Sequence, residues 1–209
     1  MNIKVCGITS IKQLQQLDGL EIDFAGLIFS KNSPRYVGEK ISKKEIQSLD
    51  IDIKKVGVFV NAPYDEIMKT ADDYALDVVQ LHGDETAHLC EKISNNIEVI
   101  KAFRVDDTSD KSIDYMLAEY DEVCDYFLFD TAAKGLHGGS GQKFDWKIIA
   151  KSKIEKPFFL SGGIAPTDGP AVKKFKHPDF YGVDVNSRFE KEPGVKDMAL
   201  VLQFKLGLK

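Results

Sequence analysis

The sequence predicts a single-domain (β/α)8 TIM barrel, and three observations support this. Short apolar runs rich in β-branched and aromatic residues recur along the whole chain, with starts roughly 20 to 30 residues apart, the size of one strand-plus-helix unit. Helical patterns lie between these runs, and no linker divides the 209 residues. We therefore expect one barrel domain over residues 1–209. A doubly wound sheet is the alternative, because periodicity alone does not separate the two folds.

The predicted elements follow one another in regular order. Ser10 and Asp84 stand where helix N-caps are expected, and Pro63 suits the first turn of the helix that follows it. The predicted strands are segments 3–7, 24–29, 55–60, 77–81, 97–103, 126–130, 157–162 and 180–185.

The composition limits the classes of partner. The formal net charge is -5, and the charges are spread along the chain, which disfavours nucleic acid because phosphate backbones attract a basic face. A few local donors could still hold a small phosphorylated molecule. Hydrophobic residues make up 43% of the chain, enough for a large core without disulfides or metal.

The cysteines and the apolar segments indicate the compartment. Cys6, Cys90 and Cys124 are widely spaced and odd in number, so they predict no disulfide framework and no metal site. The N-terminal segment is too polar for a signal peptide, and no apolar run approaches the ~20 residues of a membrane span. We expect a cytoplasmic protein, either monomer or homodimer, without a membrane partner.

In a barrel of this kind, catalytic groups lie where the strands end and the loops begin. This rule selects polar residues and glycines that directly follow the predicted strands. The candidates are Cys6, Arg35, Asn61, His82, Arg104, Asp130, Gly162, Gly163, Asp184 and Asn186.

Two of these residues could form an acid–base pair. Cys6 ends the first strand before a turn, so its thiol could face the mouth of the barrel; the ordinary alternative is a small buried hydrophobe. Asp130 closes a strongly apolar strand, where a carboxylate needs a reason to be buried. A loop ion pair with Lys134 is its alternative. Cys90 and Cys124 are better explained by packing.

A phosphate site is predicted after the last two strands. Gly162 and Gly163 would let backbone N–H groups approach an anion, and Asn186 with Ser187 could open a short helix whose N-terminus favours negative charge. A tight turn is the alternative for the paired glycines. We favour phosphate because both features fall at the same predicted end of the barrel.

Three further features are candidates for substrate contacts. Arg35, held by the preceding proline, suits two-point recognition of a carboxylate, although a solvated surface arginine is the ordinary alternative. His82 is as consistent with a structural histidine as with a substrate contact. The glycine-rich segment 131–143 predicts a functional loop, in which we give His137 no catalytic role.

Taken together, these motifs resemble the phosphoribosylanthranilate isomerase family of tryptophan biosynthesis. The matching segments span nearly the whole chain and occur in the same order. They are KVCGIT, FSKNSPRYV, VGVFVN, VQLHG, LFDTAAKGLHGGSGQKFDW, LSGGI and GVDVNSRFEKEPGVKD.

The resemblance implies an Amadori rearrangement of N-(5-phosphoribosyl)anthranilate, the third step from chorismate to L-tryptophan, without metal or organic cofactor. It implies that Cys6 is the general base and Asp130 the general acid. Arg35 would meet the anthranilate carboxylate. The expected substrate-binding residues are Arg35, His82, Gly162, Gly163, Asp184, Asn186 and Ser187.

One departure concerns the phosphate site, since this chain has Asn186-Ser187-Arg188 where the family commonly has Ser-Ser-Gly. Arg188 either reinforces phosphate binding or points to solvent. Another phosphate-binding barrel enzyme, such as a sugar-phosphate epimerase or the next enzyme of the pathway, and a non-catalytic ligand-binding barrel are the alternatives. A metal-dependent epimerase would require clustered histidines, whereas the histidines here are scattered along the chain.

Overall fold

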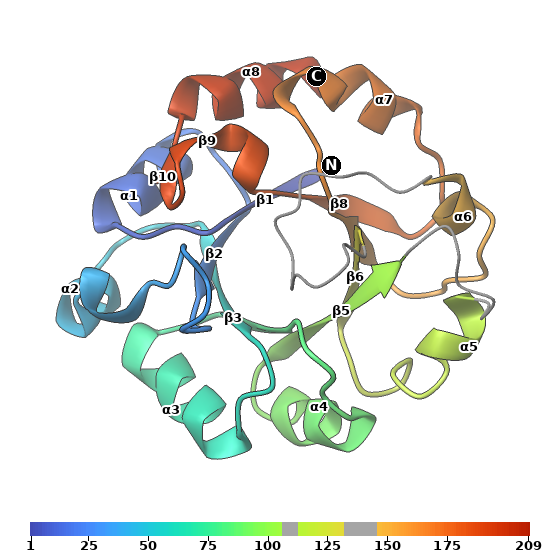
Figure 1. Ribbon diagram of the computed structural model, residues 1–209, viewed down its shortest axis with the longest axis horizontal. Helices are drawn as coiled ribbons and strands as arrows, with labels where there is room; N and C mark the ends of the chain where they lie inside the picture. Colours follow the sequence, from blue (N-terminus) through green and yellow to red (C-terminus); the bar gives the residue numbers. More distant parts are fainter. Residues whose placement is uncertain (106–112, 132–145) are drawn as a thin grey trace.

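The computed structural model describes residues 1–105, 113–131 and 146–209. Eight parallel strands form a closed ring in chain order, β1 to β8, and a shell of helices surrounds it (Figure 1). The barrel prediction is confirmed, and the open-sheet alternative is excluded because β1 pairs with β8. The strands are β1 Asn2–Cys6, β2 Phe24–Ile28, β3 Lys54–Phe59, β4 Val78–Leu81, β5 Glu98–Val105, β6 Tyr126–Thr131, β7 Phe158–Leu160 and β8 Phe180–Val185.

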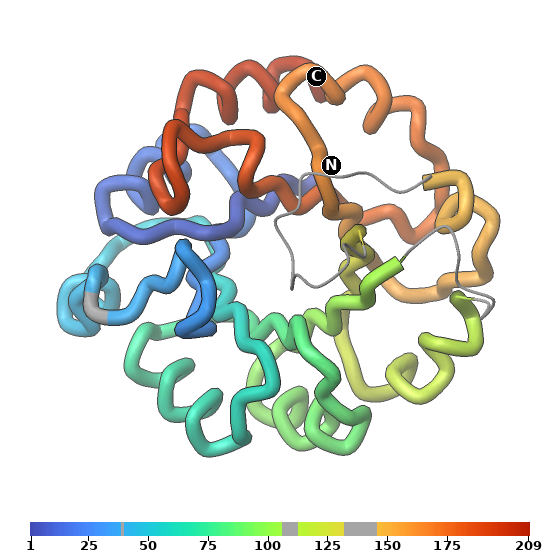
Figure 2. Tube along the Cα trace, in the orientation of Figure 1, coloured from blue at the N-terminus to red at the C-terminus, as the bar shows by residue number. Residues whose placement is uncertain are grey.

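Helices alternate with the strands, as the tube in Figure 2 shows. A short antiparallel hairpin, β9 Glu190–Glu192 and β10 Val195–Lys196, lies between β8 and the last helix. The α-helices of the described residues are α1 Ile11–Gly19, α2 Lys43–Gln47, α3 Tyr64–Tyr74, α4 Ala87–Ser94, α5 Ile113–Leu117, α6 Lys147–Ala150, α7 Gly169–Lys174 and α8 Met198–Gly207. The short 3-10 helices are η1 Gly38–Lys40, η2 Pro166–Asp168 and η3 Ser187–Phe189.

The helix caps test the local predictions. Ser10 caps α1 as expected, and Pro63 directly precedes α3. The prediction that Asp84 caps a helix is wrong: Thr86 caps α4, its hydroxyl accepting the N–H of Leu89. The backbone N–H of Asp84 instead donates to the side chain of Asn61, which holds Asp84 in the loop before the helix.

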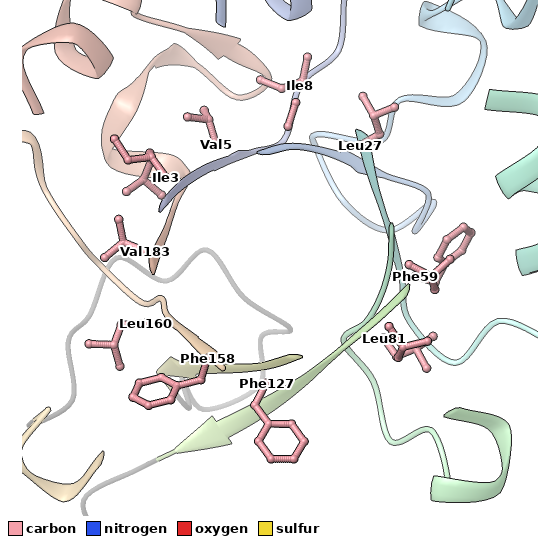
Figure 3. Packing of buried hydrophobic residues seen from close by; sticks show 14 of the residues in the cluster. Ile3, Val5, Ile8, Leu27, Phe59, Leu81, Phe127, Phe158, Leu160 and Val183 are labelled. Atoms are coloured by element: carbon pink, nitrogen blue, oxygen red, sulfur yellow. The ribbon is translucent and has the colours of Figure 1, made fainter. Parts of the chain in front are cut away.

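The strand alternation divides the core into two layers. Figure 3 shows one set of strand side chains on the side that faces the helices, including Leu27, Phe59 and Phe127. The opposite side of the strands points into the barrel interior, where a second cluster of buried apolar side chains lies. These inner residues are Phe24, Val56, Val78, Ile100, Ala102, Leu128 and Phe159.

Two cysteines belong to the layer between strands and helices. Cys90 on α4 and Cys124 before β6 are both buried there, which confirms that they serve packing. Within the described ranges, no helix is both long and apolar enough to cross a membrane.

Candidate active site

Above its apolar layer, the barrel interior becomes polar at the carboxyl ends of the strands. Cys6 is the last residue of β1 and is 4% exposed. Asp130 lies one residue before the end of β6, buried, with its Oδ1 accepting the N–H of Thr131 at 2.9 Å. Both predicted acid–base residues therefore lie at the same end of the barrel. Lys134, the alternative partner of Asp130, lies outside the described residues.

A buried ion pair lies beside the Cys6 thiol. Lys4 precedes Cys6 by two residues on the same side of β1, and its Nζ lies 2.8 Å from Oδ1 of Asp184. The other carboxylate oxygen accepts the Ser161 hydroxyl at 3.2 Å. On the neighbouring strand, a Cβ at Gly26 would lie 2.7 Å from the Cys6 sulfur, so glycine leaves room for the thiol. Asp184 was predicted as a substrate contact; here its carboxylate is held by protein groups.

The cations near Cys6 oppose the effect of burial on its pKa. Burial raises the pKa of the Cys6 thiol above its usual value, the ammonium groups of Lys4 and Lys196 act to lower it, and the Asp184 carboxylate acts to raise it. Burial alone would lower the pKa of Lys4, but the Asp184 carboxylate and Cys6 outweigh burial and raise it. Lys4 is therefore a permanent positive charge next to the thiol, and it favours the thiolate when that forms.

Arg35 is held by a second, partly buried ion-pair network. Its Nε and Nη2 contact the Glu190 carboxylate, with Nη2 2.7 Å from Oε2. Glu190 also lies 2.7 Å from Nζ of Lys196, which contacts Oδ1 of Asn186 at 2.7 Å. A Cβ at Gly7 would lie 2.7 Å from Arg35 Cδ, so the glycine permits this approach. Arg35, which was predicted to bind a carboxylate, thus pairs with the carboxylate of Glu190.

Glu190 and Lys196, the two members of this network on the β9–β10 hairpin, both have a lowered pKa. Burial raises the pKa of Glu190, but Arg35 and Lys196 outweigh it, and the net pKa lies below the usual value. Burial lowers the pKa of Lys196, which Glu190 only partly offsets. Glu190 is therefore ionised, and its one negative charge is shared by the two cations.

His82 lies beside Asp130. Its Nε2 is 3.3 Å from Asp130 Oδ2, and its Nδ1 is 2.7 Å from the side-chain nitrogen of Gln80. The loop that directly follows His82 is held in place by Glu85. The buried Glu85 carboxylate accepts the N–H of Gly83 and pairs with Lys101 at 2.8 Å. His82, left open between a structural and a functional role, is thus next to the predicted acid.

Two other strand-end candidates, Asn61 and Arg104, hold this loop, and Arg104 is also the register neighbour of Asp130 on the adjacent strand. Asn61 accepts the backbone N–H of Asp84 at 2.8 Å, and Arg104 lies 3.2 Å from the Asp84 carboxylate. Both residues therefore fix the loop before α4, and Arg104 does so from a position next to the predicted acid.

The predicted phosphate segments follow adjacent strands. Gly162 and Gly163 come directly after β7 and Ser161, with φ of 88° and 63°, a backbone conformation that favours glycine. A Cβ at Gly162 would also overlap the side chain of Thr131. After β8, Ser187 opens η3, with Asn186 before it, as the sequence predicted. Arg188 on η3 is exposed.

Several site residues were missed by sequence reasoning. Lys4 and Gln80 share the inward side with Cys6 and His82, so strand alternation was a signal for both. Ser161, directly after β7, met the strand-end rule but was overlooked next to the paired glycines. Glu190 and Lys196 lie in the hairpin, and no local pattern links them to Arg35. The glycine-rich segment predicted at 131–143 lies, apart from Thr131, outside the described residues.

Comparisons with known proteins place the chain in a family. Residues 3–205 match the model of the N-(5′-phosphoribosyl)anthranilate isomerase family. The N-(5′-phosphoribosyl)anthranilate isomerase of Parabacteroides distasonis is 41% identical, over 98% of this chain and 91% of the relative. That of Phocaeicola vulgatus is 38% identical, over 100% of this chain and 98% of the relative.

Solved structures of similar proteins share the fold of this chain. The phosphoribosyl anthranilate isomerase of Thermotoga maritima has a TM-score of 0.85 and 31% identity, over 100% of this chain and 98% of that one. A phosphoribosyl anthranilate isomerase in complex with reduced 1-(o-carboxyphenylamino)-1-deoxyribulose 5-phosphate has a TM-score of 0.83 and 30% identity, with the same coverage. The barrel, the ordered motifs and the relatives agree, and the chain belongs to the N-(5′-phosphoribosyl)anthranilate isomerase family.

Proposed function

We propose that this protein converts N-(5-phosphoribosyl)anthranilate into 1-(2-carboxyphenylamino)-1-deoxyribulose 5-phosphate, with Cys6 as general base and Asp130 as general acid. One observation carries the proposal: a buried thiol and a buried carboxyl group lie at the same mouth of a barrel of this family. The similar protein that binds a reduced form of the same compound supports the choice of substrate.

The reaction begins with opening of the ribose ring. Asp130, in its protonated form, donates its proton to the ring oxygen, and the bond between that oxygen and C1′ breaks. The lone pair of the anthranilate nitrogen forms a double bond to C1′, which gives an iminium ion. A positioned acid of this kind contributes about 10²–10⁴-fold to the rate.

The second step removes a proton from carbon. The Cys6 thiolate takes the C2′ proton, and the released electron pair forms the C1′–C2′ double bond while the iminium nitrogen becomes neutral. The resulting enolamine then tautomerises, so that C1′ gains a proton and C2′ becomes a ketone. Exchange with solvent returns Cys6 and Asp130 to their starting protonation states, and no oxidant is consumed. Lys4 and Lys196 support the thiolate electrostatically.

Substrate binding uses the remaining strand ends. The anthranilate carboxylate would replace Glu190 as the partner of Arg35, a like-for-like exchange of carboxylates. The ribose phosphate would lie against Gly162, Gly163 and the start of η3, where Asn186 and Ser187 lie. We further propose that His82 and Asp184 contact the substrate or position groups that do.

The reaction moves reducing equivalents within one molecule, because C1′ is reduced while C2′ is oxidised. This makes the protein an intramolecular oxidoreductase of the aldose–ketose type. As a biosynthetic enzyme it would act in the cytoplasm, as a monomer or a homodimer.

The direct test is to add the purified protein to phosphoribosylanthranilate and follow loss of its anthranilate fluorescence, with mass spectrometry of the product. We expect rapid loss of fluorescence and a product of unchanged mass. Fluorescence that decays only at the uncatalysed rate would contradict the proposal. Binding without turnover would instead favour a ligand-binding barrel.

A further inference from the structure

Gln80 is a buried polar residue on the inner side of the barrel. It lies in register with Val58 on β3 and Ile100 on β5, and its side chain is 0% exposed. Its Oε1 has no hydrogen-bond partner among the residues that the structure describes. An amide buried with an unpaired oxygen is unfavourable, so an apolar residue would pack this layer better. The Gln80 amide therefore has a role other than stabilising the fold.

This role involves the next inward residue, His82. The Gln80 side-chain nitrogen is 2.7 Å from Nδ1 of His82, and Nε2 on the far side of the ring is 3.3 Å from Asp130 Oδ2. That second contact is close but not aligned as a hydrogen bond. Catalytic hydrogen bonds are often long or misaligned before substrate binds and tighten afterwards.

The donor and acceptor chemistry of this row selects one form of the imidazole. The carboxylate that Asp130 becomes when it gives up its proton only accepts hydrogen bonds, so the Nε2 that faces it must carry the hydrogen. A neutral ring with hydrogen on Nε2 presents a lone pair at Nδ1, and the Gln80 amide N–H satisfies it. A hydrogen on both ring nitrogens would set Nδ1–H against the amide N–H, with no acceptor between them.

We infer that Gln80 is a positioning residue, which holds His82 as the neutral tautomer protonated on Nε2 and directs that N–H toward Asp130. This inference rests on the proposed function, in which Asp130 is the acid. A positively charged His82 would keep Asp130 ionised and unable to donate. A neutral His82 leaves Asp130 free to carry its proton, and its N–H then stabilises the carboxylate that forms as the proton leaves.

The tautomer is measured directly by ¹⁵N NMR of the substrate-free protein at neutral pH. The spectrum should show a protonated Nε2 and an unprotonated Nδ1 for His82, assigned by the loss of its signals in His82→Gln. His88, exposed on α4, and His177, buried outside the site, serve as internal references. A hydrogen on Nδ1, or on both nitrogens, would overturn the inference whether or not the variants fold.

Gln80→Glu is the decisive variant, because it keeps the shape but replaces the donor at Nδ1 by an acceptor. The spectrum should then show Nδ1 protonated, and kcat should fall by about 10²-fold, with KM changed by less than about threefold. Unchanged kcat in a folded Gln80→Glu protein would contradict the inference, and so would a loss of activity with the wild-type tautomer.

A double-mutant cycle tests whether Gln80 acts through His82. His82→Gln removes the imidazole and its tautomers, so it should itself lower kcat and leave Gln80 with no ring nitrogen to orient. Gln80→Met should lower kcat in the wild-type background and cause little further loss in the His82→Gln background. Additive losses would mean a packing role only. If wild-type protein shows no isomerase activity, the proposed function fails, while the NMR result on the tautomer still stands by itself.

Discussion

The Lys4 ammonium is completely buried in the barrel and lies 2.8 Å from the Asp184 carboxylate, directly beside the Cys6 thiol on the same strand. A buried ion pair of this kind adds little net stability, since desolvation offsets most of the attraction. In the proposed mechanism its role is functional, because it keeps a positive charge next to the sulfur that acts as the general base in its thiolate form.

Lys4→Met should therefore affect both stability and thiol reactivity. It leaves the Asp184 charge buried and unpaired, which should cost about 3–5 kcal/mol in the free energy of unfolding, measured by urea titration. The Cys6 thiolate also loses its nearest cation, so alkylation of Cys6 by iodoacetamide should slow. Peptide mass spectrometry follows Cys6 separately, with buried Cys90 and Cys124 as references.

The double variant Lys4→Met with Asp184→Asn separates these two effects. Removing both charges should recover much of the lost stability, because no unpaired charge remains. Cys6 should be alkylated faster in the double variant than in Lys4→Met, because the Asp184 charge, which disfavours the thiolate, is also removed. A wild-type alkylation rate in Lys4→Met would show that the ammonium does not support the thiolate.

The pH dependence of Cys6 has a defined sign. Burial raises its pKa above the ordinary value of 9.0, so the alkylation rate should still be rising with pH at that value. The same shift contributes stability that is fully present below the ordinary pKa and is lost as pH rises through the folded one. Both alkylation and unfolding should be measured on either side of pH 9.0, and an alkylation rate that is already level below that value would refute the shift.

Arg35→Ala should mainly raise KM and leave kcat little changed, if the guanidinium contributes uniform binding to the carboxylate of the substrate. Glu190→Gln is the matched control, because it disrupts the same ion pair and leaves the guanidinium in place. Steady-state kinetics of both variants should show the larger increase in KM for Arg35→Ala. Equal increases would mean that Arg35 only fastens the β9–β10 hairpin.

Gly162→Ala should destabilise the turn after β7. Its φ of 88° disfavours a side chain, and a Cβ there would overlap Thr131. We expect a loss of more than about 1 kcal/mol in thermal or urea unfolding, together with a higher KM. Gly19→Ala at the end of α1 is the control, because a Cβ there meets nothing within 4 Å, and it should be neutral or slightly stabilising. A neutral Gly162→Ala would contradict the strain.

The features that sequence predicted are those set by local periodicity. Strand alternation places Cys6 and Asp130 inward at the carboxyl ends of their strands, and the same alternation could have identified Lys4 and Gln80. Asp84 shows where local rules fail. It fits an N-cap by residue type, but the competing hydrogen bond from its N–H to Asn61 holds it in the loop.

The remaining features depend on contacts between distant segments. Arg35 and Glu190 are 155 positions apart, and no pattern in either segment indicates that they pair. Charge balance in a buried site decides this pairing, since Lys196 and Arg35 both need a counter-charge. The residue type and its place predict that Arg35 pairs with a carboxylate. Only the fold identifies Glu190 as the protein carboxylate that it contacts.

The acid–base pair is the central claim, and one set of measurements tests it most directly: turnover of phosphoribosylanthranilate by wild type, Cys6→Ala and Asp130→Asn at saturating substrate. Both variants remove a reacting group and keep the site's shape, so kcat should fall by at least about 10²-fold in each, while substrate binding stays near wild type. Turnover near wild type in Cys6→Ala, or in Asp130→Asn, would contradict the role assigned to that residue.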